Sequence, residues 1–175
     1  MFWMVILVIA GLVLAFLAYA SSRPDEFRVE RQIRINAPAD KVYSLLVDFH
    51  QWTIWSPWEK LDPNLTRRHS GAPTGVGAIY EWEGNKKVGK GRMEIRQAAA
   101  PSLVVIMLDF IEPWTSHNTT EFRLMSGSNA TDVTWTMHGP NLFMAKVMSV
   151  FTSMDKLVGK DFERGLQNLK AAAEG

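Results

Sequence analysis

The sequence predicts an α+β fold in which one antiparallel sheet packs against a long C-terminal helix, behind a separate apolar N-terminal segment. Three observations lead to this prediction. Residues 1–20 carry no charged side chain, the middle of the chain alternates apolar and polar residues between short turns, and residues 141–175 repeat apolar side chains at helical spacing. Consecutive strands joined by short turns form an antiparallel meander, so a parallel α/β sheet is not expected.

Composition limits the classes of function. The chain has 175 residues, of which 47% are hydrophobic, with 19 Lys and Arg against 18 Asp and Glu and no cysteine. That length suits one domain with a substantial core. The charge is nearly balanced and the basic patches are short, so no nucleic-acid partner is expected. The lack of cysteine excludes disulfides, thiolate zinc sites and a cysteine nucleophile.

Residues 1–22 are expected to form a transmembrane anchor and residues 23–175 the folded domain. A helix of about 20 residues is about 30 Å long, which matches the apolar core of a bilayer. The first charged residue is Arg23, and Pro24 follows it, as expected where a helix leaves the membrane. A cleaved secretory signal is the alternative, because Ala18-Tyr19-Ala20 has the A-x-A pattern of a cleavage site.

The basic residues near this segment indicate its orientation. No Lys or Arg precedes the apolar run, whereas four arginines follow it. Under the positive-inside rule, the protein is then a single-pass membrane protein whose soluble domain faces the cytoplasm. The four arginines are Arg23, Arg28, Arg31 and Arg34.

The domain begins with a strand and a helix. In residues 27–36, the side chains of Val29, Ile33 and Ile35 fall on one face, as in a half-buried strand. Residues 36–49, NAPADKVYSLLVDF, then place apolar side chains at helical spacing.

Residues 52–63, WTIWSPWEKLDP, place a tryptophan at every third position. Pro57 ends the preceding helical segment, and the S-x-x-E pattern predicts a capping box between Ser56 and Glu59. The tryptophans have three interpretations: a buried corner between short helices, a lip around a ligand opening, or membrane contact. We expect them to close the corner and to border an opening.

Residues 75–95, GVGAIYEWEGNKKVGKGRMEI, read as a hairpin. Gly84-Asn85 between two alternating runs predicts a two-residue turn, which places Tyr80 opposite Gly89. Aromatic side chains then lie beside strand glycines on the inward face. Glycine within a strand marks a bulge or a place left open, so this pairing is a first indication of internal space.

Three further strands are expected over residues 101–111, 118–125 and 130–139, because their apolar and polar residues alternate. Residues 141–175 are then expected to form one long amphipathic helix. Gly159 and Gly165 fall within it, each at a cost of about 1 kcal/mol relative to alanine.

The entry INAPADKVYSLLVDFHQWTIWSPW resembles the start of the SRPBCC superfamily, the START/Bet v 1-like helix-grip proteins. More narrowly, WSPWEKLDP, GVGAIYEWEGNKKVGKGRMEI and MDKLVGKDFERGLQNLK are similar to membrane-anchored bacterial proteins of the polyketide cyclase/dehydrase-like kind. The resemblance implies a curved antiparallel sheet gripping the C-terminal helix, with a hydrophobic cavity between them. The superfamily includes lipid carriers, cyclases and hydrolase activators and has no universal catalytic motif, so no catalytic residue is assigned.

Inward-facing apolar side chains are the candidate ligand-binding residues, with plain core packing as the alternative for each. No histidine pair has metal-ligand spacing, and no metal or other cofactor is expected. Asp109 and His138 can act as acid or base only if they point into the cavity; otherwise they are outward residues near strand ends. The candidate lining residues are Tyr80, Trp82, Met93, Phe110, Trp135, Met137, Phe151 and Met154.

Three functions compete. The leading hypothesis is a membrane-tethered domain that binds a hydrophobic small molecule, such as a lipid, an isoprenoid or a polyketide, in an internal cavity. The second is a cyclase or dehydratase that uses a cavity acid or histidine. The third is an interaction module whose interior is filled by its own side chains. The expected partners are the small molecule and the membrane, and the sequence identifies no protein partner.

Overall fold

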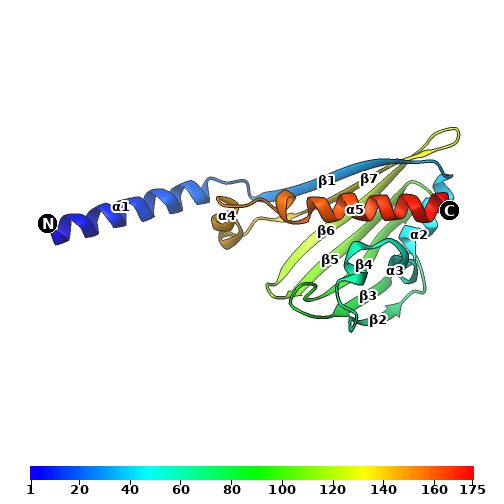
Figure 1. Ribbon diagram of the computed structural model, residues 1–175, viewed down its shortest axis with the longest axis horizontal. Coiled ribbons are helices and arrows are strands. Elements are labelled where there is room, and N and C mark those ends of the chain that lie inside the picture. The colour runs from blue at the N-terminus through cyan, green and yellow to red at the C-terminus, as the bar shows by residue number, and fades with distance from the viewer.

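The computed structural model describes residues 1–175. The helix α1 projects from one end of a body in which a curved sheet holds α5 against its inner face (Figure 1). The strands are β1 (Glu26–Ile35), β2 (Thr66–Gly71), β3 (Ala78–Glu83), β4 (Lys90–Ala99), β5 (Leu103–Glu112), β6 (Ser116–Ser126) and β7 (Thr131–Pro140). The helical elements are α1 (Phe2–Ser21), α2 (Ala39–Val47), η1 (Phe49–Gln51), α3 (Trp52–Trp55), η2 (Pro57–Lys60), α4 (Phe143–Ser149) and α5 (Met154–Glu174).

The sheet confirms the predicted α+β class. Its seven strands follow the order β1-β7-β6-β5-β4-β3-β2, and every neighbouring pair is antiparallel. The register of β4 against β5 shifts at Lys90/Gly91 and again at Ile95/Gln97. Such bulges add twist and bend a strand, so they help to curve the sheet around α5.

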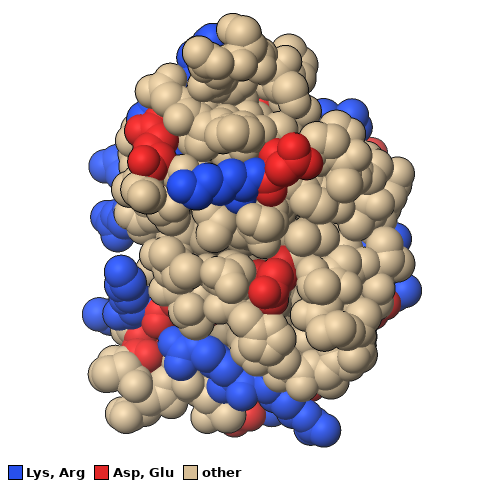
Figure 2. All heavy atoms as spheres, turned by 90° about the vertical axis from the view of Figure 1, so that its right-hand side faces the viewer, with Lys and Arg blue, Asp and Glu red and all other residues tan.

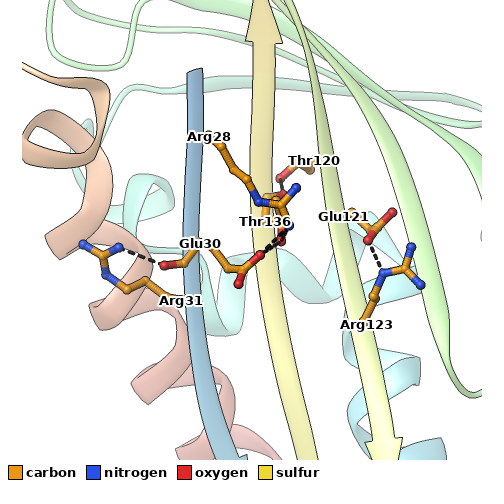
Figure 3. Close-up of polar contacts among 7 residues, drawn as sticks. All are labelled: Arg28, Glu30, Arg31, Thr120, Glu121, Arg123 and Thr136. Carbon is orange, nitrogen blue, oxygen red and sulfur yellow. Dashed lines mark hydrogen bonds and ion pairs between the residues drawn. The ribbon is translucent and has the colours of Figure 1, made fainter. Parts of the chain in front are cut away.

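The two faces of the sheet differ in polarity. The inner face, α2, the short helical elements and α5 share one core of 24 buried residues. On the outer face, Arg28 pairs with Glu30 at 2.5 Å, Thr136 donates to the same carboxylate at 2.9 Å, and Arg123 pairs with Glu121 (Figure 3). Exposed pairs of this kind add little stability. The core therefore lies on the concave side alone.

The β3–β4 hairpin differs from its predicted register. Tyr80 pairs with Met93 rather than Gly89, and Trp82 pairs with Gly91. The turn is a six-residue loop over residues 84–89, closed by a 2.9 Å hydrogen bond from the Gly84 N–H to the Gly89 carbonyl. The shift is an even number of residues, so each side chain keeps its predicted face.

The glycines of this hairpin do not leave open space, which corrects the expectation. A Cβ on Gly91 would lie 2.3 Å from the Trp82 ring, because that ring covers the glycine. Gly89 has a φ of +63°, and its Cβ would lie 2.3 Å from the Glu112 carbonyl oxygen. The bare backbone positions therefore admit a tryptophan ring and a neighbouring strand rather than a ligand.

The C-terminal segment is two helices, where one was predicted. Helix α5 begins after Ser153, whose hydroxyl accepts a 3.2 Å hydrogen bond from the Lys156 N–H and caps the helix. The preceding α4 has no buried residue. The apolar periodicity of α4 continues that of α5, which is why one helix was predicted. The break at Ser153 instead directs the segment before it toward α1, and the rings of Phe151 and Phe16 lie 5.9 Å apart.

The two glycines of α5 mark close contacts with the sheet and with η2. A Cβ on Gly165 would lie 2.8 Å from the Trp135 ring and 3.1 Å from Pro57. A Cβ on Gly159 would lie 2.2 Å from the guanidinium of Arg31, which crosses the helix there. That guanidinium bonds Asp155 at 2.7 Å and Glu163 at 2.8 Å, which explains how an arginine is accommodated on the inner face of β1.

Candidate ligand-binding cavity

A cavity of about 250 Å³ lies between the inner face of the sheet, the η2 corner and α5. Of its 17 lining residues, 13 are hydrophobic. They come from segments far apart in the sequence, which the sheet curvature and α5 bring together. The lining residues are Trp52, Ser56, Trp58, Glu59, Leu65, Tyr80, Trp82, Lys87, Val88, Met93, Leu108, Phe110, Thr120, Trp135, Met137, Val158 and Phe162.

Six of the eight candidate site residues line this cavity, and two do not. Those that do are Tyr80, Trp82, Met93, Phe110, Trp135 and Met137. Met154 packs at the edge of the core without bordering the cavity. Phe151 is 76% exposed and lies beside α1, because the break before α5 turns α4 away from the sheet.

The three tryptophans of residues 52–58 close a corner. Trp52 and Trp55 are buried, and their indole N–H groups donate to the carbonyls of Leu46 at 3.1 Å and Leu45 at 3.0 Å. Those carbonyls belong to the last turn of α2, where backbone carbonyls have no hydrogen-bond donor within the helix. Trp58 meets the rings of Trp135 and Phe162 edge-on, at 5.8 and 6.0 Å, and borders the cavity.

One buried carboxylate interrupts the apolar lining. The Tyr80 hydroxyl donates to Glu59 Oε1 at 2.5 Å, and Arg67 Nε donates to Glu59 Oε2 at 2.6 Å. A second guanidinium nitrogen of Arg67 reaches the Glu59 carbonyl at 2.9 Å. Both carboxylate oxygens thus have donors, which a buried charge requires.

The predicted capping box between Ser56 and Glu59 is wrong, and Glu59 instead forms the buried contact with Tyr80 and Arg67. Ser56 precedes η2 but makes no side-chain cap hydrogen bond. Glu59 instead turns toward Tyr80 and Arg67. The sequence could not identify this contact, because it depends on bringing η2 against β2 and β3.

The electrostatics of this corner keep both donors protonated. Burial raises the pKa of Tyr80, and the hydrogen bond to Glu59 raises it further. The hydrogen bond to Glu59 also raises the pKa of Arg67. Chemically, the cavity can therefore hold an apolar body and offer one polar corner made of a neutral phenol and a neutralised carboxylate.

Asp109 and His138 do not face the cavity. Asp109 lies between the inward-facing Leu108 and Phe110, and its carboxylate bonds His117 Nδ1 at 2.7 Å on the outer face. His138 pairs across the sheet with Arg28 and Thr119, next to the inward-facing Met137. Asp109 and His138 are therefore outward residues, and neither can serve as the cavity acid or base. Nowhere in the chain do three His, Asp or Glu side chains gather as metal ligands would.

An antiparallel sheet that curves around a C-terminal helix and encloses an apolar cavity defines a helix-grip protein. The family model described as "Polyketide cyclase / dehydrase and lipid transport" matches residues 26–174. The chain therefore belongs to this family, within the SRPBCC, Bet v 1-like superfamily. A comparison with curated proteins found no match.

Solved structures share this fold at low sequence identity. Protein CV1439 from Chromobacterium violaceum is 15% identical, with a TM-score of 0.60 over 87% of this chain and 99% of that one. The Aha1 dimer protein from Colwellia psychrerythraea is 21% identical, with a TM-score of 0.57 over 85% and 96%. The di-domain ARO/CYC BexL from the BE-7585A biosynthetic pathway is 14% identical, with a TM-score of 0.61 over 91% of this chain and 53% of BexL. At these identities, the comparisons show that the proteins share a fold.

Proposed function

We propose that the protein is a membrane-tethered binding domain for a hydrophobic small molecule, held in the cavity between the sheet and α5. The observation that carries this proposal is the cavity of about 250 Å³ with its largely apolar lining and the buried polar contact between Tyr80 and Glu59. At about 30 Å³ per water molecule, that volume exceeds what a few trapped waters fill. This disfavours an interaction module with a filled interior.

The cavity dimensions constrain the ligand. Pockets for drug-sized ligands hold about 300–1,000 Å³, so this cavity suits a small apolar molecule or one end of a longer chain. A hydroxyl or carbonyl group on the ligand would meet Tyr80 and Glu59. A lipid, an isoprenoid or a polyketide has this combination of an apolar body and a polar end.

The tether is α1, with residues 1–22 as anchor and 23–175 as the domain. An 18-residue window of α1 has a mean hydropathy of 2.6, and none of that window is buried against the body. A cleaved signal would share these properties. The intact mass of the protein from the membrane fraction separates the two, because cleavage after Ala20 would remove the first 20 residues. A cytoplasmic position predicts that an added single cysteine in the domain resists membrane-impermeant maleimide in intact cells.

An enzyme of the cyclase or dehydratase kind is the second candidate, because Glu59 and Tyr80 place an acid–base pair in the cavity wall. The family description and the ARO/CYC neighbours are consistent with it. A buried carboxylate beside a protonated phenol can move a proton to or from a bound carbonyl compound.

Native mass spectrometry of the purified full chain tests the leading proposal. We expect a co-purified apolar molecule that organic extraction removes. Glu59→Gln separates the two candidate functions once that molecule is identified: binding alone predicts affinity within about tenfold of the wild type, whereas catalysis predicts retained binding and abolished turnover. A chain with no co-purified molecule and no affinity for extracted lipids would contradict both.

A further inference from the structure

Exposed apolar side chains gather at the α1 end of the body. The antiparallel register brings the start of β1, the end of β7, the β5–β6 turn and the β3–β4 loop to this one end, and α4 lies beside them (Figure 1). We call the exposed apolar residues there the anchor-side surface. They are Ile111, Trp114, Leu142, Phe143, Met144, Met148 and Phe151. Surfaces of this kind mark an interaction site.

The opposite end differs. It carries Lys and Arg together with Asp and Glu side chains, spread over its surface (Figure 2). Its exposed apolar side chains, such as Val76 in the β2–β3 turn and Met125 near the end of β6, stand on separate elements. Single exposed apolar residues are ordinary on a soluble surface and indicate no partner.

The contact between α4 and α1 identifies the occupant of the anchor-side surface. The Phe151 ring lies 5.9 Å from Phe16, five residues before the end of α1 at Ser21. At about 1.5 Å per residue, Phe151 therefore reaches about 7.5 Å back along the apolar helix. Amphipathic helices that lie on a bilayer bury their apolar face to about 5–10 Å. If α1 spans the membrane, Phe151 would therefore lie at the depth that such helices reach in a bilayer.

Polar contacts hold α4 at that position. The guanidinium of Arg23 donates to the Ser149 carbonyl at 3.2 Å, and Lys146 Nζ bonds Asp25 at 2.5 Å. Both cations lie where α1 joins the body, which is the level of the lipid head groups if α1 spans the membrane. Basic side chains at this level are attracted to anionic lipids.

The cavity reaches the same end of the body. Trp82 lies at the end of β3 and Phe110 near the end of β5, and both line the cavity together with Lys87 and Val88 of the β3–β4 loop. The Lys87 side chain is exposed on that loop. The loop side of the cavity and the anchor-side surface therefore share one end of the molecule.

We propose that the anchor-side surface rests on the bilayer, with α4 in the lipid interface, so that the cavity opens at the membrane rather than into bulk water. This inference rests on the proposed function and specifies it: the ligand is a membrane-resident lipid or lipid-soluble molecule that exchanges directly with the bilayer. Apolar molecules then need not cross water to reach Trp82 and Phe110.

Single cysteines test this arrangement, since the natural chain has none. The full-length variants Met144→Cys, Lys87→Cys and Met125→Cys are labelled with a nitroxide and reconstituted into phosphatidylcholine vesicles containing phosphatidylglycerol. Met144 and Met125 are matched controls, because they are 69% and 68% exposed at opposite ends of the domain. Spin-label accessibility to oxygen, which concentrates in lipid, is compared with accessibility to a water-soluble nickel complex.

We expect the oxygen-to-nickel accessibility ratio to be several-fold higher at position 144 than at 125, with position 87 between them. A ratio at 144 equal to that at 125 would overturn the placement of α4. A ratio at 87 equal to that at 125 would overturn the membrane-facing cavity. Neither readout depends on a bound ligand, so failure of the ligand-binding proposal would be seen separately in the mass spectrum.

Discussion

The Tyr80 hydroxyl donates a 2.5 Å hydrogen bond to Glu59 Oε1 within a largely apolar cavity wall. This bond joins η2 to β3, and Arg67 on β2 completes the charge compensation. The same groups thus fix the tryptophan corner to the sheet edge and give the cavity its polar end. A structural role and a ligand-contacting role coincide here, and their contributions must be separated by measurement.

The stability role of this contact can be measured with a double-mutant cycle. We expect Tyr80→Phe to destabilise the fold by about 1.5–3 kcal/mol, because Glu59 Oε1 loses its donor while it stays buried. Glu59→Leu leaves Arg67 without its partner, and its cost should not add to that of Tyr80→Phe in the double variant. Thermal unfolding of the four proteins in the same detergent measures the coupling. Strictly additive costs would show that the contact contributes nothing.

Gly165 tests the close contact between α5 and the sheet. Alanine favours a helix by about 1 kcal/mol over glycine, yet we expect Gly165→Ala to destabilise the protein by about 1–3 kcal/mol. Its Cβ would lie 2.8 Å from the Trp135 ring, which is closer than ordinary van der Waals contact, and that ring is already stacked on Phe162 at 4.0 Å. Gln167→Ala, on the exposed face of the same helix, is the matched control and should be nearly neutral. A stabilised Gly165→Ala variant would show that the ring moves freely.

The sequence predicted elements whose signal is local. The strands β1 and β3 to β7, the inward face of β3 and the burial of Trp52 and Trp55 follow from periodicity and turn residues. The hairpin register was wrong because Gly84-Asn85 has the residues of a tight turn, whereas the observed loop continues to Gly89. Local pattern cannot distinguish these two closures when both preserve the faces.

The candidate site was predicted less completely than the fold. The aromatic lining follows from alternation along β3 and β7, but Phe151 has the spacing of a core helix residue and instead packs toward α1. The role of Glu59 could not be predicted because its partners, Arg67 and Tyr80, lie on two other elements, β2 and β3. A buried polar contact formed across three elements leaves no periodic signal in any one of them.

Filling the cavity tests whether it is the binding site. We expect Leu108→Trp to reduce affinity for a fluorescent polyene fatty acid by at least about tenfold, because the larger side chain occupies the cavity that Leu108 lines. Met107→Trp is the control, because the neighbouring side chain points to the outer face of β5. Titration of each full-length variant in detergent measures the affinity. Equal affinities for the two variants would place the binding site elsewhere.

His69 provides a pH dependence whose sign can be worked out. Its ring stacks on His50 at 4.1 Å, and its Nε2 is buried without a hydrogen-bond partner. Burial lowers the pKa of His69, and the nearby His50 lowers it further. In the unfolded chain the pKa of a histidine is about 6.5. Between these two pKa values the unfolded chain binds more protons, so the free energy of unfolding falls as the pH drops through about 6.5.

We therefore expect the protein to unfold at lower temperature at pH 5 than at pH 8, and His69→Phe to lose part of this difference. Phenylalanine keeps an aromatic ring against His50 and Tyr80 but cannot titrate. Thermal unfolding of both proteins between pH 5 and pH 8 measures the slope. Asp48 beside His50 has a lowered pKa, so its contribution is lost only on acidification below the ordinary carboxylate range and does not alter this window. An unchanged slope in His69→Phe would assign the pH dependence to another histidine.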